Sequence, residues 1–338
     1  MKRFALAFLL LWPLLSVAQT PMDKSPLNTA TLVSPYYFGP NAFQVPEVLD
    51  GRVSRQLRVE LAGDYFHGAY DDHTTDIALK LNIPLWTDRV NLSAWMPVTE
   101  WWNNTEENLK RCRVEEENMA KAKKGHVPGD VYVSIDVQLM RERRYRPDWT
   151  VRAALKTASS NYFYYARYYD APGYFFDTSV AKSMRVGHNK QWAHSLRLAL
   201  STGFLCWQTD NGRQNDAVQF GVRAMWENRH FSLSQTFAGY SGWEHSASHG
   251  GKEAHDQPMV LRTDAVVHIK KFDIVAAYQY GLHDYPFHQV RLGLAYRWDI
   301  LKVRSEKSAI EREQSDACID YAKREQTRGE ASSDGVKK

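Results

Sequence analysis

Apolar and polar residues alternate along most of this chain, in stretches that end at polar breaks. Residues 131–139 read Val-Tyr-Val-Ser-Ile-Asp-Val-Gln-Leu, and Ile77, Leu79, Leu81 and Ile83 belong to the apolar half of another stretch. Alternation with a period of two predicts a strand with one apolar and one polar face. A strand of about ten residues is long enough to cross a bilayer with tilt, with alternate side chains facing lipid.

Twelve such strands are predicted, and the polar middle of the sixth makes it the weakest. They lie near residues 57–66, 75–85, 90–98, 130–141, 149–159, 174–186, 194–206, 216–226, 231–240, 259–269, 272–281 and 288–299. Without the sixth strand the count would be odd, which single-chain bacterial barrels avoid.

The links between these strands alternate in length. Tight turns such as Glu227–His230 and Lys270–Lys271 alternate with longer links such as Thr99–Gly129 and Ser241–Pro258. Outer-membrane barrels have short periplasmic turns and long external loops. The sequence therefore predicts an all-β fold, a transmembrane antiparallel up-and-down β-barrel of about 12 strands.

Aromatic residues gather at the predicted strand ends. The turn-end group is Trp86, Trp149, Trp192, Trp226, Phe231 and Trp298, and the loop-end group is Tyr65, Trp101, Trp102, Phe204, Trp207, Tyr240 and Trp243. Two aromatic girdles are typical of a membrane barrel, whereas the alternative is the filling of a soluble β-core.

The ends of the chain predict export. Lys2 and Arg3 precede the apolar run Phe4–Leu15, and Ser16-Val17-Ala18 has the small residues of a cleavage site. We expect residues 1–18 to be a signal peptide, 19–56 a periplasmic segment or plug, 57–299 the barrel, and 300–338 a charged periplasmic tail. The aromatic and Pro-rich residues 34–40 are expected at or inside the periplasmic mouth, and residues 103–124 are predicted to form an external helix that stops at Gly125.

Composition adds little about function. The 43 Lys and Arg against 39 Asp and Glu give a formal net charge of +4, too small to indicate nucleic acid. The three cysteines are too few for a disulfide framework. A bridge between Cys112 and Cys206 and free thiols both remain open, and Cys318 lies in the tail. No cofactor is indicated.

The signal peptide, strand rhythm, loop asymmetry and girdles resemble Gram-negative outer-membrane barrels, especially the twelve-stranded small-solute channels and the outer-membrane phospholipase. The segment 34–40 and the stretch Gly239-Tyr240-Ser241-Gly242-Trp243-Glu244 are similar to an uncharacterised barrel family of Bacteroidetes-type bacteria. The resemblance implies residence in the outer membrane, contact with lipid, and insertion by the barrel-assembly machinery. The long extension after Trp298 departs from barrels whose chain ends at the last strand.

Strand parity assigns many charged residues to the lumen, because a charge facing lipid would cost about 2–4 kcal/mol at mid-bilayer. The basic candidates for binding a solute are Arg58, Lys80, Arg152, Lys156, Arg197, Arg223, Arg262 and Arg291. Their excess over inward acids predicts a channel with a mild preference for small anionic solutes. The alternative is that acids pair with them and the lumen is simply filled.

Two further site types receive weaker support. His245, His249 and His255 share one predicted external loop, but they lack the spacing of a structural metal site, so no metal is assigned. His194 and Ser195 are adjacent on a strand, so their side chains point to opposite faces and cannot form a hydrolase pair. The sequence favours a channel over a closed barrel acting through its external loops, and places a lipid hydrolase third.

Overall fold

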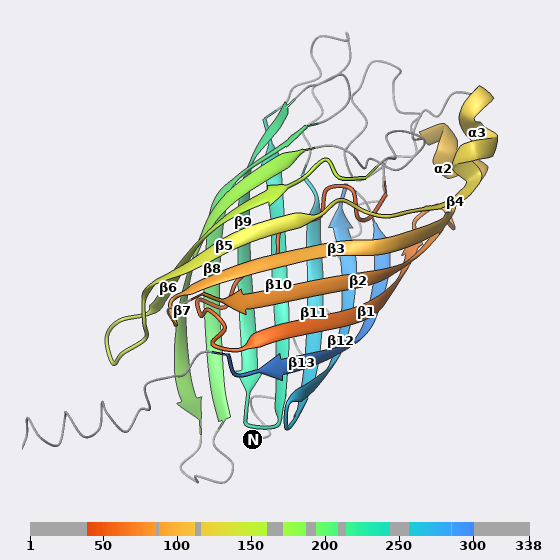
Figure 1. Cartoon of the computed structure of the whole chain (residues 1–338). Coiled ribbons are helices and arrows are strands. Elements are labelled where there is room, and N and C mark those ends of the chain that lie inside the picture. The colour runs from red at the N-terminus through yellow and green to blue at the C-terminus, as the bar shows by residue number, and fades with distance from the viewer. Residues whose placement is uncertain are drawn as a thin grey trace, which may run out of the picture. The chain divides into compact units, whose positions relative to one another are not determined.

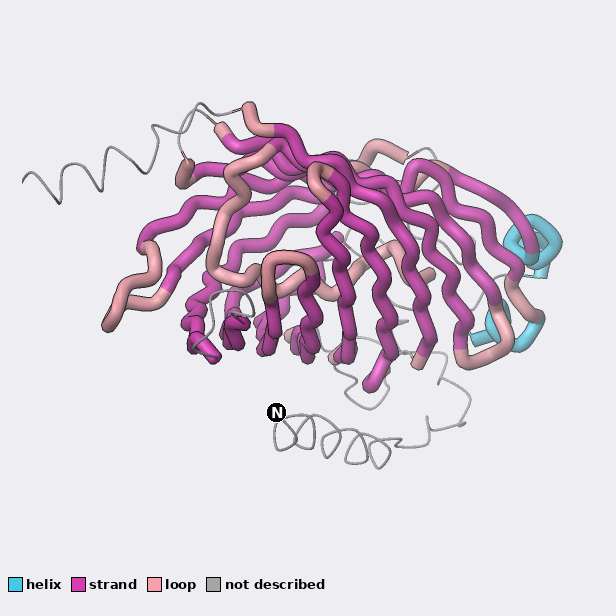
Figure 2. The backbone as a smooth tube through the Cα atoms, turned by 90° about the horizontal axis from the view of Figure 1, so that it is seen from below, coloured by secondary structure: helices cyan, strands magenta, loops and turns pink. Residues whose placement is uncertain are grey.

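The computed structural model describes residues 39–85, 88–111, 116–160, 172–186, 194–208, 214–243, 257–284 and 286–300. The chain forms two compact units, Met1–Trp298 and Asp299–Lys338. The first unit contains a single sheet that closes on itself (Figures 1 and 2).

Twelve long antiparallel strands and one short strand make up this sheet in the part of the chain that is described. They are β1 (Leu57–Gly68), β2 (His73–Pro84), β3 (Val90–Asn103), β4 (Lys124–Val127), β5 (Tyr132–Met140), β6 (Asp148–Lys156), β7 (Gly173–Val186), β8 (His194–Gln208), β9 (Gln214–Glu227), β10 (Phe231–Gly242), β11 (Met259–Ile269), β12 (Phe272–His283) and β13 (Phe287–Trp298). Each long strand pairs with its neighbours in sequence, and β1 pairs with β13 from Leu57↔Trp298 to Gly68↔Phe287. This pairing closes the barrel, so the predicted fold class is confirmed.

The short strand β4 was not predicted. It pairs with Glu100–Asn103 at the end of β3, beyond the residues of β3 that pair with β5. Gly125 lies in β4 rather than simply ending a helix. A Cβ at this position would come within 2.4 Å of the Trp102 ring, so a larger residue would not fit. The helix predicted before it is present as two short pieces, α2 (Glu106–Arg111) and α3 (Glu116–Lys123).

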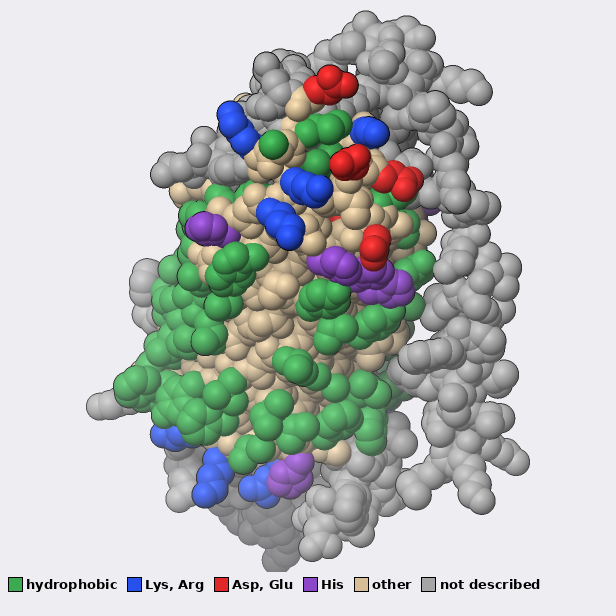
Figure 3. Space-filling model, turned by 90° about the vertical axis from the view of Figure 1, so that its right-hand side faces the viewer, with side chains coloured by type: hydrophobic (Ala, Val, Ile, Leu, Met, Phe, Trp, Pro, Cys, Tyr) green, Lys and Arg blue, Asp and Glu red, His purple; other side chains and the backbone are tan. Residues whose placement is uncertain are grey.

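The outward face of the barrel is an apolar belt. Its most exposed members include Leu61, Leu155, Leu200, Leu292 and Leu294, each more than half exposed. Figure 3 shows apolar side chains covering the middle of one face, with charged side chains above and below them. Such a surface is unfavourable in water and is what lipid chains require of a spanning barrel.

No helix in the described part of the chain is long and apolar enough to cross a bilayer.

Three predicted members of the loop-end girdle are buried instead of facing lipid. Trp207 and Tyr240 are fully buried, whereas Tyr65, Trp101 and Trp243 are exposed as a girdle requires. The reason is strand parity, because Trp207 follows the inward series of Arg197 and Ala199 on β8. Trp102 is also buried, and its indole Nε1 donates to the carbonyl of Ala122 at 3.0 Å.

Candidate functional site: the occupied lumen

The lumen contains a part of the chain's own N-terminal region. Residues 39–56 are here called the luminal segment. Its N-terminal residues contact inward side chains at the loop end of the barrel, and its C-terminal residues contact those at the turn end. Asn41 Nδ2 donates to Asp76 and Glu100 near the loop end at 2.6 and 2.7 Å. Arg52 reaches Glu227, the last residue of β9, at the turn end. The segment thus runs down the inside of the wall and leads directly into β1.

An aromatic cluster holds the segment at the loop end. Phe43 is 1% exposed and its ring lies 5.6 Å from that of Trp207. Phe43 belongs to a buried cluster with Tyr132, Phe175, Trp207 and Tyr240. Aromatic side chains bury much apolar surface, and ring pairs at this spacing are favourable. Tyr132, Phe175, Trp207 and Tyr240 therefore form an aromatic socket around Phe43. Two of them, Trp207 and Tyr240, were predicted for the outer girdle.

Three wall arginines bind backbone carbonyls of the segment. Arg152 Nη2 donates to the carbonyl of Glu47 at 2.6 Å, and Arg223 Nη1 donates to that of Val48 at 3.1 Å. Arg197 Nε donates to the carbonyl of Asp50 at 2.7 Å. The three arginines come from β6, β9 and β8. These charge-assisted bonds satisfy three backbone carbonyls of the segment and hold it against the wall.

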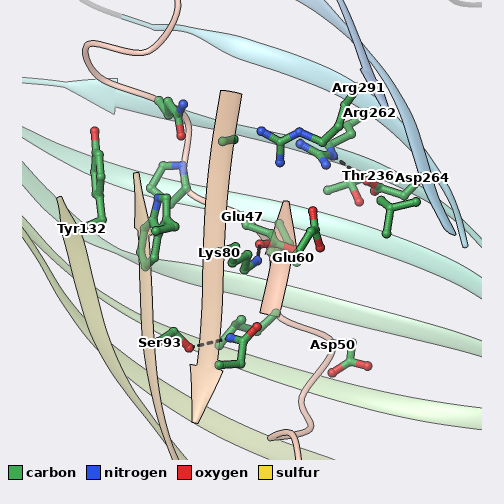
Figure 4. Close-up of a pocket in the computed structure, with 18 of the residues that line it drawn as sticks. Glu47, Asp50, Glu60, Lys80, Ser93, Tyr132, Thr236, Arg262, Asp264 and Arg291 are labelled. Atoms are coloured by element: carbon green, nitrogen blue, oxygen red, sulfur yellow. Dashed lines mark hydrogen bonds and ion pairs between the residues drawn. The ribbon is translucent and has the colours of Figure 1, made fainter. Parts of the chain in front are cut away.

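Glu47 is the acidic centre of the segment. Its carboxylate pairs with Lys80 (Figure 4). It also lies 3.8 Å from Arg223. Burial alone would raise the pKa of Glu47, but Lys80, Arg223 and Arg262 outweigh burial and hold that pKa well below its ordinary value. The carboxylate is therefore ionised at neutral pH, and its charge draws the segment to the wall.

The segment bends at Gly51 near the turn end. Gly51 has φ +79°, and a Cβ there would lie 2.9 Å from the Cβ of Ala181. Only glycine adopts this conformation without cost. Beyond the bend, the Arg52 guanidinium bridges Asp50 and Glu227 at 2.7 and 2.9 Å. Both features fix where the segment leaves the lumen.

Each of the eight basic residues predicted for the lumen points inward and has an acidic partner. The pairs are Arg58–Glu60, Lys80–Glu47, Arg152–Asp177, Lys156–Asp130, Arg197–Asp148, Arg223–Glu47, Arg262–Asp264 and Arg291–Asp64. Lys156 and Arg197 are almost completely buried, and six of the eight line the open part of the lumen. Whether any of them binds a solute stays a prediction.

A cavity of about 660 Å³ remains beside the luminal segment. Eight described lining residues are basic and eight are acidic: Arg52, Arg58, Lys80, Arg152, Arg223, Arg262, Arg291 and Arg297 against Glu47, Asp50, Glu60, Asp76, Asp136, Glu227, Asp264 and Asp273. A volume of this size suits a small molecule. The lining is charged but balanced, so it suits a hydrophilic solute more than a hydrocarbon.

Other predicted features fall partly outside the described residues. Cys112, Cys318, His245, His249 and His255 are not described, while Cys206 is a buried free thiol. The Ser195 hydroxyl donates to Glu227 at 3.0 Å. The aromatic stretch 34–38 is likewise not described, but Phe43, which follows it closely, lies at the loop end rather than at the turn end.

The solved structures similar to this chain are outer-membrane barrels. One is an outer membrane channel from Pseudomonas putida F1, at 13% identity and a TM-score of 0.49, with 75% of this chain and all of that chain covered. Another is the NanC porin, at 12% identity and a TM-score of 0.42, covering 70% of this chain and 98% of that one. A third is the translocator domain of the autotransporter NalP from Neisseria meningitidis, at 10% identity and a TM-score of 0.38, covering 72% and 88%. No protein-family model and no curated protein matches the chain.

Proposed function

We propose that this protein is an outer-membrane channel for small hydrophilic solutes, and that its own luminal segment gates the pore. The closed sheet and its apolar belt support membrane residence, since closed barrels are the β-structure that spans a membrane. The observation that carries the gating proposal is the set of bonds from Arg152, Arg223 and Arg197 to three carbonyls of the segment.

The segment is held by contacts that can be broken as a unit. Apart from the apolar side chains of Ala42, Phe43, Val45 and Val48, the segment touches the wall mainly through hydrogen bonds and ion pairs, and the cavity beside it provides room for movement. Water entering the lumen can replace these polar contacts, whose net contributions are about 0.5–1.5 kcal/mol for a neutral hydrogen bond and about 1.5–3 kcal/mol for a bond to a charged group. Movement of the segment would widen the cavity into a continuous path.

The mild anion preference predicted from the sequence is part of this proposal, but the pairing limits its size. A field in the lumen depends on unpaired charge, and the lining carries equal numbers of basic and acidic groups. Arg262 and Arg291 are the basic groups to test, because both line the cavity and their ion-pair partners, Asp264 and Asp64, belong to the barrel wall.

A cross-link between segment and wall tests the gate. A Cβ placed at Gly221 would lie 2.3 Å from Cγ2 of Val48, so Val48→Cys with Gly221→Cys brings two thiols together. In a background with the three native cysteines replaced by Ser, we expect planar-bilayer conductance to be lost on oxidation and restored by dithiothreitol. Val48→Cys alone, treated identically, is the matched control and should show no redox response.

Two results would reject the gated channel. Equal conductance in the oxidised and reduced cross-linked protein would show that the segment is not the gate. Absence of conductance in both states and in the wild type would favour a closed barrel that acts through its external loops. The aromatic socket around Phe43 and the ion pairs of the lumen are the observations that support this second candidate.

A further inference from the structure

A row of histidines crosses the outer face of the barrel at its loop end. His73 of β2 pairs in register with His67 of β1, and His67 pairs with His288 of β13. All three share the parity of the exposed Tyr65 and Val290, so they point outward. Figure 3 shows histidine side chains gathered above the apolar belt, beside acidic groups. The row lies where the first and last strands of the barrel meet, outside the lumen.

The first two rings lie against each other and beside a carboxylate. The His67 and His73 rings are stacked with centroids 4.9 Å apart, and their Nδ1 atoms are 3.3 Å apart. Asp71, in the turn between β1 and β2, places Oδ1 3.7 Å from Nε2 of His73. One ligand atom from each of these three residues lies within 4.8 Å of the other two.

We propose that His67, His73 and Asp71 bind a divalent transition-metal ion, of which Zn²⁺ is the reference case. Two imidazoles and a carboxylate are a donor set that suits this class of ion. Two ligands of tetrahedral zinc, each about 2.0–2.1 Å from the metal, lie roughly 3.4 Å apart. The 3.7 Å between His73 and Asp71 is close to this value, and Asp71 is 82% exposed, so its side chain can rotate.

The surrounding residues orient the ligands. The Tyr65 hydroxyl lies 2.8 Å from Nδ1 of His73, which leaves Nε2 for the metal on the side of Asp71. Such partners fix the ring and tautomer of a ligating histidine. Asp71 has φ +59°, a left-handed conformation for a residue other than glycine, in the turn that brings its carboxylate beside His73. Water would complete the coordination of the metal, because the site lies at the surface.

Metal binding can be measured on the full chain. Tag-free protein in detergent, stripped with a chelator, should bind Zn²⁺ with a stoichiometry of one at this site by titration calorimetry. His67→Gln and His73→Gln should each weaken this binding about tenfold or more. The matched control replaces His245, His249 and His255 by Gln, which removes three other imidazoles but should leave the affinity unchanged. Heat-modifiable migration shows that each variant is folded.

A spectroscopic measurement separates coordination from nonspecific adsorption. Co²⁺ bound to the wild type should show d–d absorption, and this absorption should be lost in His73→Gln and retained in the loop variant. Lack of Zn²⁺ binding by the wild type would overturn the proposal. Binding that survives both single substitutions, or that disappears with the three loop histidines, would overturn it equally.

Discussion

Gly51 offers a direct measure of how firmly the luminal segment is seated. Replacing Gly51 by Ala keeps the side chain small but places a Cβ on a residue with φ +79°, only 2.9 Å from the Cβ of Ala181. A left-handed conformation costs an L-residue about 1–2 kcal/mol. This cost applies only while the segment is seated, since a released segment relaxes to another conformation. Gly51→Ala should therefore favour release by about 5- to 30-fold from the backbone term alone.

The assay is the labelling rate of a buried thiol in the segment. Val48 is 3% exposed, so a cysteine at that position reacts only when the segment leaves the wall. When seating is fast relative to labelling, the rate is proportional to the released fraction, and it reports the change even if that fraction is small. We expect the labelling rate of Val48→Cys to rise about 5- to 30-fold when Gly51→Ala is added.

Gly63→Ala is the matched control. Gly63 lies on the outward face of β1, and the nearest atom to a Cβ there is 3.9 Å away, so the same chemical change meets open space. It should leave the labelling rate of the cysteine unchanged. An unchanged rate in Gly51→Ala, or an equal rise in Gly63→Ala, would refute the seating of the segment at this bend.

Three further predictions follow from the charges and the topology. Replacing Arg262 and Arg291 together by Gln removes the basic partners of Asp264 and Asp64, so reversal potentials should move toward cation preference. The control Arg229→Gln, in an exposed turn, should not change the reversal potential. Glu47 has a lowered pKa when the luminal segment is seated, so its contribution to seating should be complete above its ordinary pKa of 4.5 and should decrease as the pH falls below that value. Conductance should therefore rise on acidification. The substitution Glu47→Gln should abolish this part of the pH response. Single cysteines at Lys123 and Arg229 should differ on intact cells, with only the first reacting with an impermeant thiol reagent; the reverse pattern would invert the predicted orientation.

The strands and their faces could be predicted because a spanning barrel repeats one simple rule along its whole wall. A period of two in hydrophobicity is strong where one face meets lipid. The parity of Arg262 and Arg291 therefore predicts that they face the lumen, and both line its cavity. Position near a strand end predicts an outer girdle for Trp207 and Tyr240, whereas strand parity correctly predicts that both face the lumen. The short strand β4 depends on the close approach of Gly125 to Trp102, which no local pattern records.

The lumen could be predicted only in part. Sequence parity identifies the basic residues that point inward, but it does not say which acids they meet. The pairing of Lys80 with Glu47 joins a strand to a segment that has no alternation of its own. Arg152, Arg197 and Arg223 bind backbone carbonyls of the segment. These bonds cannot be predicted from the sequence of the segment, because every residue carries a carbonyl.

The position of the luminal segment has a consequence for biogenesis. The segment immediately precedes β1, whereas the strand that completes the wall, β13, is the last to be synthesised. The circle of strands can form around the segment before the seam of β1 and β13 joins, which avoids threading a chain through a finished cylinder. The arginines of β6, β8 and β9 then meet their carbonyl partners while the wall is still open. The luminal segment would then serve as an internal template around which the strands assemble, and its contacts in the finished barrel would be those formed during assembly.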